Sequence, residues 1–136
     1  MAEQFKLRII TPERIFYEGD VEMIVFQSVE GELGVLAGHI PLTTVIDSTV
    51  FYLKHTMEEP QKMAAVHEGF VQILPDEVTV LTESAEWPEE IDAERAKAAK
   101  ERAEKRLEQK SENRDLDLRR AQLALMRSLT RLELKR

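Results

Sequence analysis

The sequence contains no cysteine and no long apolar run. Without cysteine the chain has no disulfide framework, no thiol nucleophile and no thiolate metal site. No run approaches the roughly 18–20 apolar residues that span a bilayer. The first ten residues, MAEQFKLRII, also lack the basic start and small-residue cleavage site of a signal peptide. We therefore expect a protein that is made and kept in the cytosol.

Positive charge is in short supply, and it is unevenly placed. The chain has 19 Lys and Arg against 26 Asp and Glu, a net charge of −7. This balance argues against a nucleic-acid partner, because proteins that track phosphates carry a positive surface. Acidic residues predominate up to Glu90, whereas basic residues predominate from Ile91 onward. The two parts of the chain therefore meet different electrostatic demands.

Motifs of catalysis are missing as well. The sequence has neither a GxGxxG run nor a glycine-rich loop that ends in Gly-Lys-Ser/Thr. The three histidines, His39, His55 and His67, do not have metal-ligand spacing. No order of Ser, His and Asp indicates a nucleophilic triad. We expect no catalytic residue, no metal site and no enzyme activity of the chain by itself.

The first part of the chain has the patterns of β-strands. Phe5, Leu7 and Ile9 alternate with more polar residues, and residues 21–26 are apolar on both faces. Further strands are expected over residues 49–55, 62–67, 69–74 and 78–82, with turns at 11–12, 18–20, 58–60 and 75–77. Many short strands with apolar residues on both faces favour two packed sheets. We predict an antiparallel β-sandwich over residues 1–86.

The composition changes abruptly at residues 87–90. Every glycine lies at or before Gly69 and the last proline is Pro88, after which strong helix formers dominate. We predict a helix from Asp92, its N-cap, to about Gln109. A polar connection at 111–114 and a second helix over 115–134 complete an antiparallel hairpin. The chain is thus predicted to be α+β, with an N-terminal sandwich and a helical hairpin over residues 87–136.

The seam between the two predicted helices is thin. One helix offers a stripe of mostly alanine and the other a stripe of mostly leucine, at spacings of three and four: Ala96, Ala99, Ala103 and Leu107 against Leu118, Ala121, Leu125, Leu129 and Leu132. Such a seam buries little apolar area, so the hairpin is expected to be marginally stable alone. It is either a mobile element or a hairpin that simply packs on the sandwich.

The densest cluster of glycine lies in residues 30–41, EGELGVLAGHIP. Three closely spaced glycines predict backbone turns with positive φ, and hence a tight loop with Glu32 at its exposed tip. Such a loop is either a structural connection between strands or a surface for a partner.

Several long segments resemble one family. The run EGELGVLAGHIPL resembles the signature of the epsilon subunit of the bacterial rotary proton-translocating ATP synthase. ITPERIFYEGDVEMI, HEGFVQILPDEVTVL, IDAERAKA and RRAQLALMRSLTRL are similar to the same family, in order along nearly the whole chain. Two positions depart from it: Ala37 stands where many relatives have proline, and Glu68 where many have glycine.

The resemblance implies a non-catalytic subunit that couples proton translocation to ATP synthesis. The sandwich is expected to bind the gamma subunit of the central stalk and the membrane rotor ring. Glu32 and His39 match the rotor contact. The subunit would lie at the cytoplasmic face of the bacterial cell membrane, as a peripheral protein.

The resemblance also implies an ATP site in the helices. Its residues correspond to Ile91, Asp92, Arg95, Ala96, Arg102, Arg127 and Arg131. Guanidinium groups suit phosphate oxygens, and Arg127 and Arg131 lie four apart on one helical face. The alternative is that Asp92 only caps the helix and the arginines are solvated. No cofactor is required, and ATP would be a regulatory ligand.

The resemblance implies a second function for the hairpin. When it opens, its second helix extends towards the alpha and beta subunits of the catalytic head and hinders ATP hydrolysis. ATP bound by the compact hairpin would then favour the non-inhibitory form. Two rival interpretations remain open at this point: a free-standing ATP-sensing binding module and a small β-sandwich enzyme.

Overall fold

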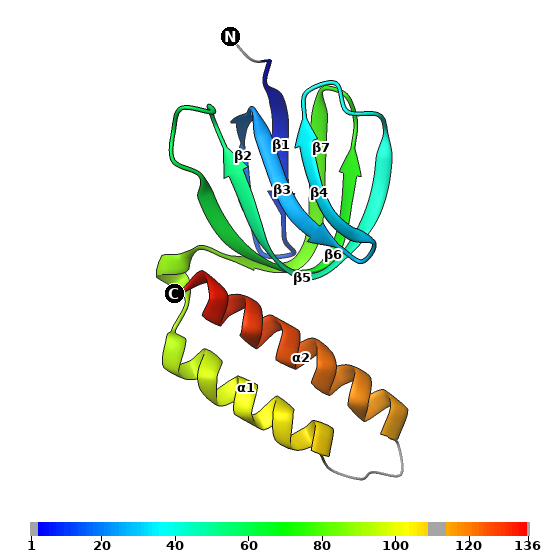
Figure 1. The fold of residues 1–136 in the computed structure, drawn as a ribbon, viewed down its shortest axis with the longest axis vertical. Coiled ribbons are helices and arrows are strands. Elements are labelled where there is room, and N and C mark those ends of the chain that lie inside the picture. Colours follow the sequence, from blue (N-terminus) through cyan, green and yellow to red (C-terminus); the bar gives the residue numbers. More distant parts are fainter. Residues whose placement is uncertain (1–2, 109–113, 136) are drawn as a thin grey trace.

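The computed structural model describes residues 3–108 and 114–135, which form a β-sandwich followed by two α-helices (Figure 1). The strands are β1 Phe5–Ile10, β2 Ile15–Val21, β3 Met23–Ser28, β4 Gly31–Leu36, β5 Leu42–Lys54, β6 Lys62–Ile73 and β7 Glu77–Glu86. A short 3₁₀ turn, Pro88–Glu90, leads into α1 Ala93–Glu108 and α2 Arg114–Leu134. The predicted α+β fold is confirmed.

The described strands form one continuous hydrogen-bonded sheet in the order β2-β1-β7-β6-β5-β3-β4. All neighbouring pairs are antiparallel except β1 and β7, which are parallel. Figure 1 shows the sheet curved over on itself, with β3 and β4 in front of β1. The long strands β5 and β6 carry this curvature, and β4 is an edge strand.

The interior of the sandwich is filled by alternate residues of the strands. Phe5, Leu7 and Ile9, the alternating set of β1, are all buried. The rings of Phe26 and Phe51 stack at 5.2 Å between centroids, which joins β3 to β5. Burial of each large apolar side chain contributes about 1.5–3 kcal/mol. This cluster therefore gives the sandwich a core of its own.

Three predicted strand boundaries are wrong, because pairing between strands overrides local turn preference. Residues 18–20, expected as a turn, lie inside β2, where Gly19 pairs with Leu7. The strands expected at 62–67 and 69–74 are one strand, β6. Strand β5 begins at Leu42, well before residue 49. At Gly69 an added Cβ would lie 2.0 Å from the Leu81 carbonyl oxygen, so only glycine fits between β6 and β7 there.

Residues 31–36, expected as part of a loop, form the edge strand β4. Glu32 pairs with Gln27 of β3 and therefore does not lie at a loop tip. Val35 is buried while its neighbours are exposed, which is the period of two that a strand requires. The glycines with positive φ, Gly31 and Gly38, stand at the two ends of this strand.

Glu68 has a backbone conformation that side chains rarely adopt. Its φ is 43°, in the middle of β6 and next to Gly69. The left-handed region costs a residue with a Cβ about 1–2 kcal/mol. Glutamate is therefore strained at this position.

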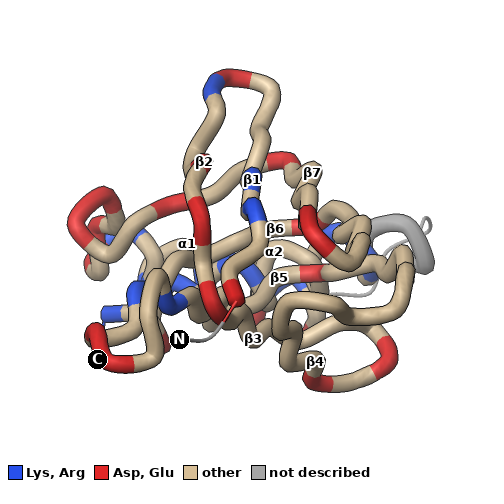
Figure 2. Tube along the Cα trace, turned by 90° about the horizontal axis from the view of Figure 1, so that it is seen from above, with Lys and Arg blue, Asp and Glu red and all other residues tan. Residues whose placement is uncertain are grey.

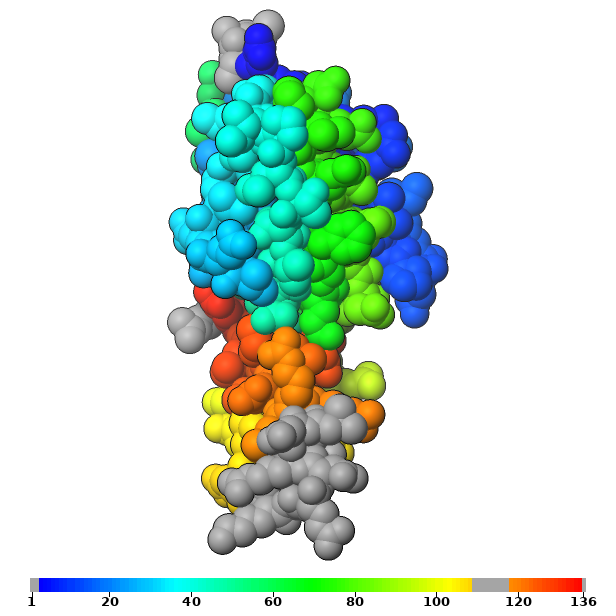
Figure 3. Space-filling model, turned by 90° about the vertical axis from the view of Figure 1, so that its right-hand side faces the viewer, coloured from blue at the N-terminus to red at the C-terminus, as the bar shows by residue number. Residues whose placement is uncertain are grey.

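Helix α2 lies between the sandwich and α1 (Figure 3). The buried residues that join the helices are small: Ala96 and Ala103 of α1 and Ala121 of α2. Leu129, expected in the buried stripe, is 45% exposed, while its neighbours Ser128 and Thr130 are buried. Helix α2 packs against the sandwich on one side and against α1 on the other. Its small side chains allow a close approach on both sides. The predicted end of the first helix at Gln109 and most of the 111–114 connection lie outside the described residues.

The junction between sandwich and hairpin has a small apolar cluster of its own. Ile91, just before α1, and Leu134, at the end of α2, pack against Val50 of β5 and Ala65 of β6. Trp87 belongs to the main core, where its ring stacks on Phe16 at 4.3 Å. The hairpin therefore meets the sandwich over a much smaller apolar area than the one that holds the sandwich together.

This difference generates a prediction about the two domains. A chain that ends after Glu90 should remain a folded β protein by circular dichroism and cooperative thermal unfolding. Loss of the junction should cost on the order of 3 kcal/mol, because it exposes Val50 and Ala65. An unfolded product would show that the helices are part of one core and that the division into two domains is wrong.

Candidate functional site

Two adjoining cavities lie along the hairpin, where α1, α2 and the end of β7 meet. The Asp92 cavity, of about 380 Å³, is lined by Glu86, Glu90, Ile91, Asp92, Arg95, Ala96, Ala99, Arg102 and Arg131. The Arg127 cavity, of about 310 Å³, is lined by Ala99, Arg102, Ala103, Arg106, Ala124, Arg127, Ser128 and Arg131. Ala99, Arg102 and Arg131 border both, so the two cavities form one hollow surface.

All seven residues of the predicted ATP site border these cavities. Ile91, Asp92, Arg95 and Ala96 come from the start of α1, and Arg102 lies two turns further along it. Arg127 and Arg131 come from α2, far away in sequence. The hairpin and the end of β7 thus gather three carboxylates, Glu86, Glu90 and Asp92, with several guanidinium groups and small alanines around a single hollow.

The start of α1 is fixed by Asp92. Its Oδ1 accepts a hydrogen bond from the Arg95 amide at 3.2 Å, and its carbonyl accepts one from the Ala96 amide at 3.0 Å. The predicted N-cap is therefore confirmed. Ile91 is buried against the sandwich, whereas Asp92 is exposed. The cap uses one carboxylate oxygen, which leaves the other for a ligand.

The two α2 arginines of the predicted ATP site are already paired with carboxylates of the sandwich. Arg131 donates from Nε to Glu86 Oε1 at 2.7 Å, and Arg127 forms an ion pair with Glu68 of β6. A more exposed pair joins Arg119 to Asp47 of β5 at 3.8 Å. Figure 2 shows Lys and Arg segments along the helices and also on β1 and the β1–β2 loop, while many of the Asp and Glu segments lie on the sandwich.

Glu86 is the most connected of these carboxylates. Burial raises its pKa, but hydrogen bonds from His67 and Arg131 and the charge of Arg131 outweigh burial, so the pKa lies below its usual 4.5. A lowered pKa in the folded state contributes stability that is present above the ordinary carboxyl pKa and lost as the pH falls through the lowered value. At neutral pH the network therefore stabilises the docked helix.

His67 holds Glu86 from the sandwich side. Its ring is fully buried, with Nε2 2.9 Å from Glu86 Oε1 and Nδ1 3.1 Å from Ser48 Oγ. With a proton on Nε2 the ring donates to Glu86, and Nδ1 can accept from the Ser48 hydroxyl. Although this chain of Ser, His and Glu resembles a triad, the ring is out of reach of any substrate. It orients Glu86.

The carboxylates were not predicted as site residues from the sequence. Glu86 gives no local signal, because nothing in its neighbourhood predicts a contact with Arg131, 45 residues away. Glu68 gives one signal, its departure from the family's glycine, but that departure alone does not predict its partner. Pairings between distant elements become visible only with the fold.

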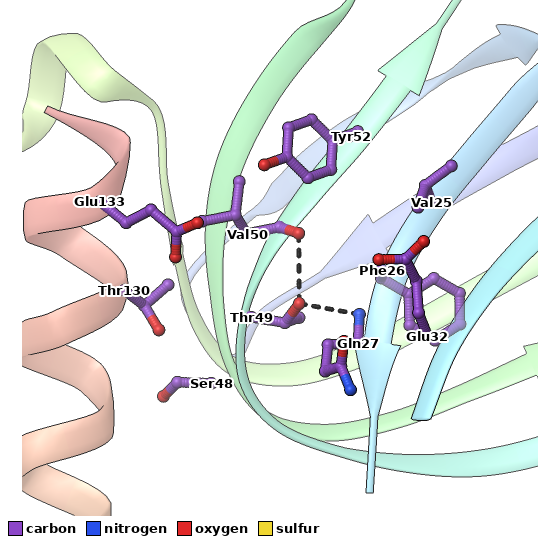
Figure 4. Close-up of a pocket in the computed structure, with 10 residues that line it drawn as sticks. All are labelled: Val25, Phe26, Gln27, Glu32, Ser48, Thr49, Val50, Tyr52, Thr130 and Glu133. Carbon is purple, nitrogen blue, oxygen red and sulfur yellow. Dashed lines mark hydrogen bonds between the residues drawn. The ribbon is translucent and has the colours of Figure 1, made fainter. Parts of the chain in front are cut away.

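Glu32 and His39 are not brought together. Glu32 borders a third cavity, of about 250 Å³, between the sandwich and the C-terminal end of α2 (Figure 4). Thr130 and Glu133 of α2 lie across it, and Thr49 accepts a hydrogen bond there from the Gln27 amide at 2.9 Å. His39 lies beyond the other end of β4, where Nδ1 is 2.7 Å from the Ile40 carbonyl oxygen.

An apolar stripe crosses three strands on the outer surface of the sandwich. Val45 of β5 pairs with Phe70 of β6, which pairs with Leu81 of β7. Their exposed fractions are 52%, 44% and 39%. Ile40, beside His39, is 75% exposed. Contiguous exposed apolar residues of this kind mark surfaces for other proteins.

Over residues 3–108 and 114–135, His, Asp and Glu nowhere gather in a group that could hold a metal ion. In the same described part of the chain, neither helix is long and apolar enough to cross a membrane.

Two family models together match nearly the whole chain. Residues 4–88 match the β-sandwich domain of the ATP synthase delta/epsilon chain, and residues 89–135 match its long α-helix domain. Similar proteins carry the name ATP synthase epsilon chain. The one from Halalkalibacterium halodurans is 48% identical over 93% of both chains. The one from Caldanaerobacter subterraneus subsp. tengcongensis is 45% identical over 98% of this chain and 95% of its own.

Solved structures share the fold. A chain in the mitochondrial ATP synthase of Euglena gracilis, solved as the OSCP/F1/c-ring assembly, superposes with a TM-score of 0.80 at 22% identity, over 93% of this chain and 78% of its own. A chain in the central stalk and c-ring assembly of the mitochondrial ATP synthase of Tetrahymena thermophila superposes with a TM-score of 0.58 at 10% identity, over 95% of this chain and 98% of its own. Because the sequence relatives match both domains over nearly their full length, the chain belongs to the family of ATP synthase epsilon chains, the non-catalytic delta/epsilon-type subunits of that complex.

Proposed function

We propose that the chain is a central-stalk subunit that couples proton translocation to ATP synthesis and restrains ATP hydrolysis with its helices, with ATP as the regulatory signal. One observation carries this proposal: the hairpin gathers the predicted ATP residues around one hollow while it is held to the sandwich by a small junction. A ligand that bridges the two helices would stabilise the compact hairpin.

The sandwich supplies the surfaces for the rest of the complex. The stripe of Val45, Phe70 and Leu81 suits the gamma subunit, because its exposed apolar area can be buried against another protein. The edge strand β4, which contains Glu32 and is followed by His39, suits the membrane rotor ring. The solved relatives lie in central-stalk and c-ring assemblies, which supports these partners. The chain would then be peripheral, at the cytoplasmic face of the membrane.

The rotor contact can be tested by cross-linking. Because the chain contains no cysteine, Glu32→Cys or His39→Cys introduces one reactive site. A photoreactive cross-linker at either position should reach the rotor ring in the assembled complex, since Glu32 lies in the edge strand and His39 follows it. Lys97→Cys, on the exposed side of α1, is the control and should not reach the ring. Products with stator subunits alone would overturn this contact.

The chemistry of the two cavities fits a nucleotide. Arg102, Arg127 and Arg131 can donate to phosphate oxygens, and Asp92 can accept a hydrogen bond from the adenine amino group. Ala96 and Ala99 leave room beside the helix axis. Within the described residues no group of metal ligands accompanies the arginines, and the Ser128 hydroxyl beside them donates to the Ala124 carbonyl at 3.0 Å. ATP would therefore bind without being consumed.

Two substitutions test the ATP site without touching the ion pairs to the sandwich. Arg95→Ala and Arg102→Ala should each weaken ATP binding to the isolated chain about tenfold or more, because each removes a charge-assisted hydrogen bond. Isothermal titration calorimetry gives the dissociation constant for ATP. Arg120→Ala, an exposed arginine of α2 that borders neither cavity, is the matched control. Binding like that of the parent in both variants would reject the site.

The proposed switch between a docked and an extended α2 follows from the charge of that helix. Opened from the sandwich, α2 would present Arg119, Arg127 and Arg131 to the alpha and beta subunits of the catalytic head, where acidic surfaces attract them. ATP held by the compact hairpin would oppose this extension, since a ligand shifts the equilibrium towards the form that it binds. Inhibition should therefore be strongest when ATP is scarce.

Hydrolysis by the whole complex tests the switch. A complex with the chain truncated after Glu90 should hydrolyse ATP faster at low ATP than the intact complex, because it lacks the helices that would hinder the head. At high ATP the two rates should converge. The truncated sandwich should remain bound, which co-purification with the complex checks. Equal rates for the two complexes at low and high ATP would show that the hairpin is not an inhibitor here.

A further inference from the structure

Glu68 combines an unusual backbone conformation with a contact to α2. Its φ of 43° places a side chain with a Cβ in the left-handed region, at a point of β6 where the pairing with both β5 and β7 skips a residue. Its carboxylate leaves the sheet and pairs with Arg127 of α2. Backbone strain of this kind persists where another contact holds the residue in place, and it points to a role for that contact.

The contact is partly shielded from water. The side chains of Arg127 and Glu68 are 33% and 27% exposed, much less than the 59% of Arg119 in the outer pair with Asp47. One turn along α2, Arg131 binds Glu86, which the buried ring of His67 holds in place. Adjacent strands therefore present two oriented carboxylates to two arginines on the same face of α2.

We infer that Glu68 is a latch: it holds α2 on the sandwich when no nucleotide is bound. The sandwich carboxylate satisfies Arg127, which would otherwise face the Arg127 cavity without an anion. The compact hairpin thus has an internal partner for an arginine of the proposed ATP site. The effect of the latch on hydrolysis rests on the proposed function, but the latch itself does not.

A latch and an ordinary stabilising ion pair give different results for Glu68→Gly. Glycine relieves the strain at φ 43° and removes the carboxylate. The sandwich should therefore melt at the same or a higher temperature, while the amides of α2 exchange with solvent about tenfold faster in the full chain without ATP. If Glu68 were only an ordinary stabilising ion pair, Glu68→Gly would lower the melting temperature of the sandwich as well as speed exchange in α2.

Three further variants complete the test by hydrogen exchange. Glu68→Gln keeps the strain and loses the charge, so it should also speed exchange in α2. Glu77→Gln, which removes a carboxylate that pairs with Arg8 at 3.7 Å, is the control and should leave α2 unchanged. Glu68→Arg combined with Arg127→Glu should restore slow exchange. Unchanged exchange of α2 in both Glu68→Gly and Glu68→Gln would overturn the latch.

The assembled complex separates the latch from the proposed function. With Glu68→Gly, hydrolysis at low ATP should fall, because the helices open more readily. If α2 exchanges faster but hydrolysis does not change, the latch stands and the inhibitory function fails. If exchange in α2 does not change, the latch fails whatever the rate of hydrolysis.

Discussion

The contact on which the rest of this molecule depends is the docking of α2 on the sandwich. It consists of a small apolar cluster around Ile91 and Leu134 and of ion pairs from Glu68 and Glu86 to the arginines of the helix. Partly exposed ion pairs contribute modestly, and a cluster of four buried residues adds only a few kcal/mol. The sandwich has its own large core, so we expect the helices to leave without unfolding it. Because this docking contact is weak, a ligand that binds only the docked form can shift the balance between docked and undocked helices.

The proposed function gives the same arginines three anionic partners, of which the structure contains the first. In the compact form they meet carboxylates of the sandwich. In the proposed ligand complex they meet phosphate, and in the proposed extended form they meet acidic surfaces of the catalytic head. The uneven charge of the chain, acidic before Glu90 and basic after it, has a direct structural meaning: the two domains attract one another and compete with outside partners.

Much of the fold could be predicted from local pattern. The alternation of Phe5, Leu7 and Ile9 and the break at Pro88 were sufficient for a sandwich followed by helices. Asp92 was recognised as the cap of α1. The errors arose where distant pairing decides the outcome: β4 was expected as a loop, because its glycines masked the period of two around Val35. The exposed Leu129 shows that a helix packed on two sides does not follow a single stripe.

The candidate site was predicted only in part. The resemblance supplied the seven hairpin residues, and the structure places all of them around one hollow. It did not supply Glu68, Glu86 or His67, because their contacts join β6 and β7 to a helix far along the chain. Membership in the epsilon family excludes the free-standing sensor and the small enzyme as interpretations.

The central claim is that the hairpin can leave the sandwich and that bound ATP keeps the hairpin docked on it. The most direct test is the distance between spin labels at Glu59→Cys, on the exposed loop after β5, and Gln122→Cys, on α2, measured by pulsed electron resonance in the assembled complex. The account predicts a single short distance with saturating ATP and an added population of long distances when ATP is removed. One unchanged distance under both conditions would contradict it.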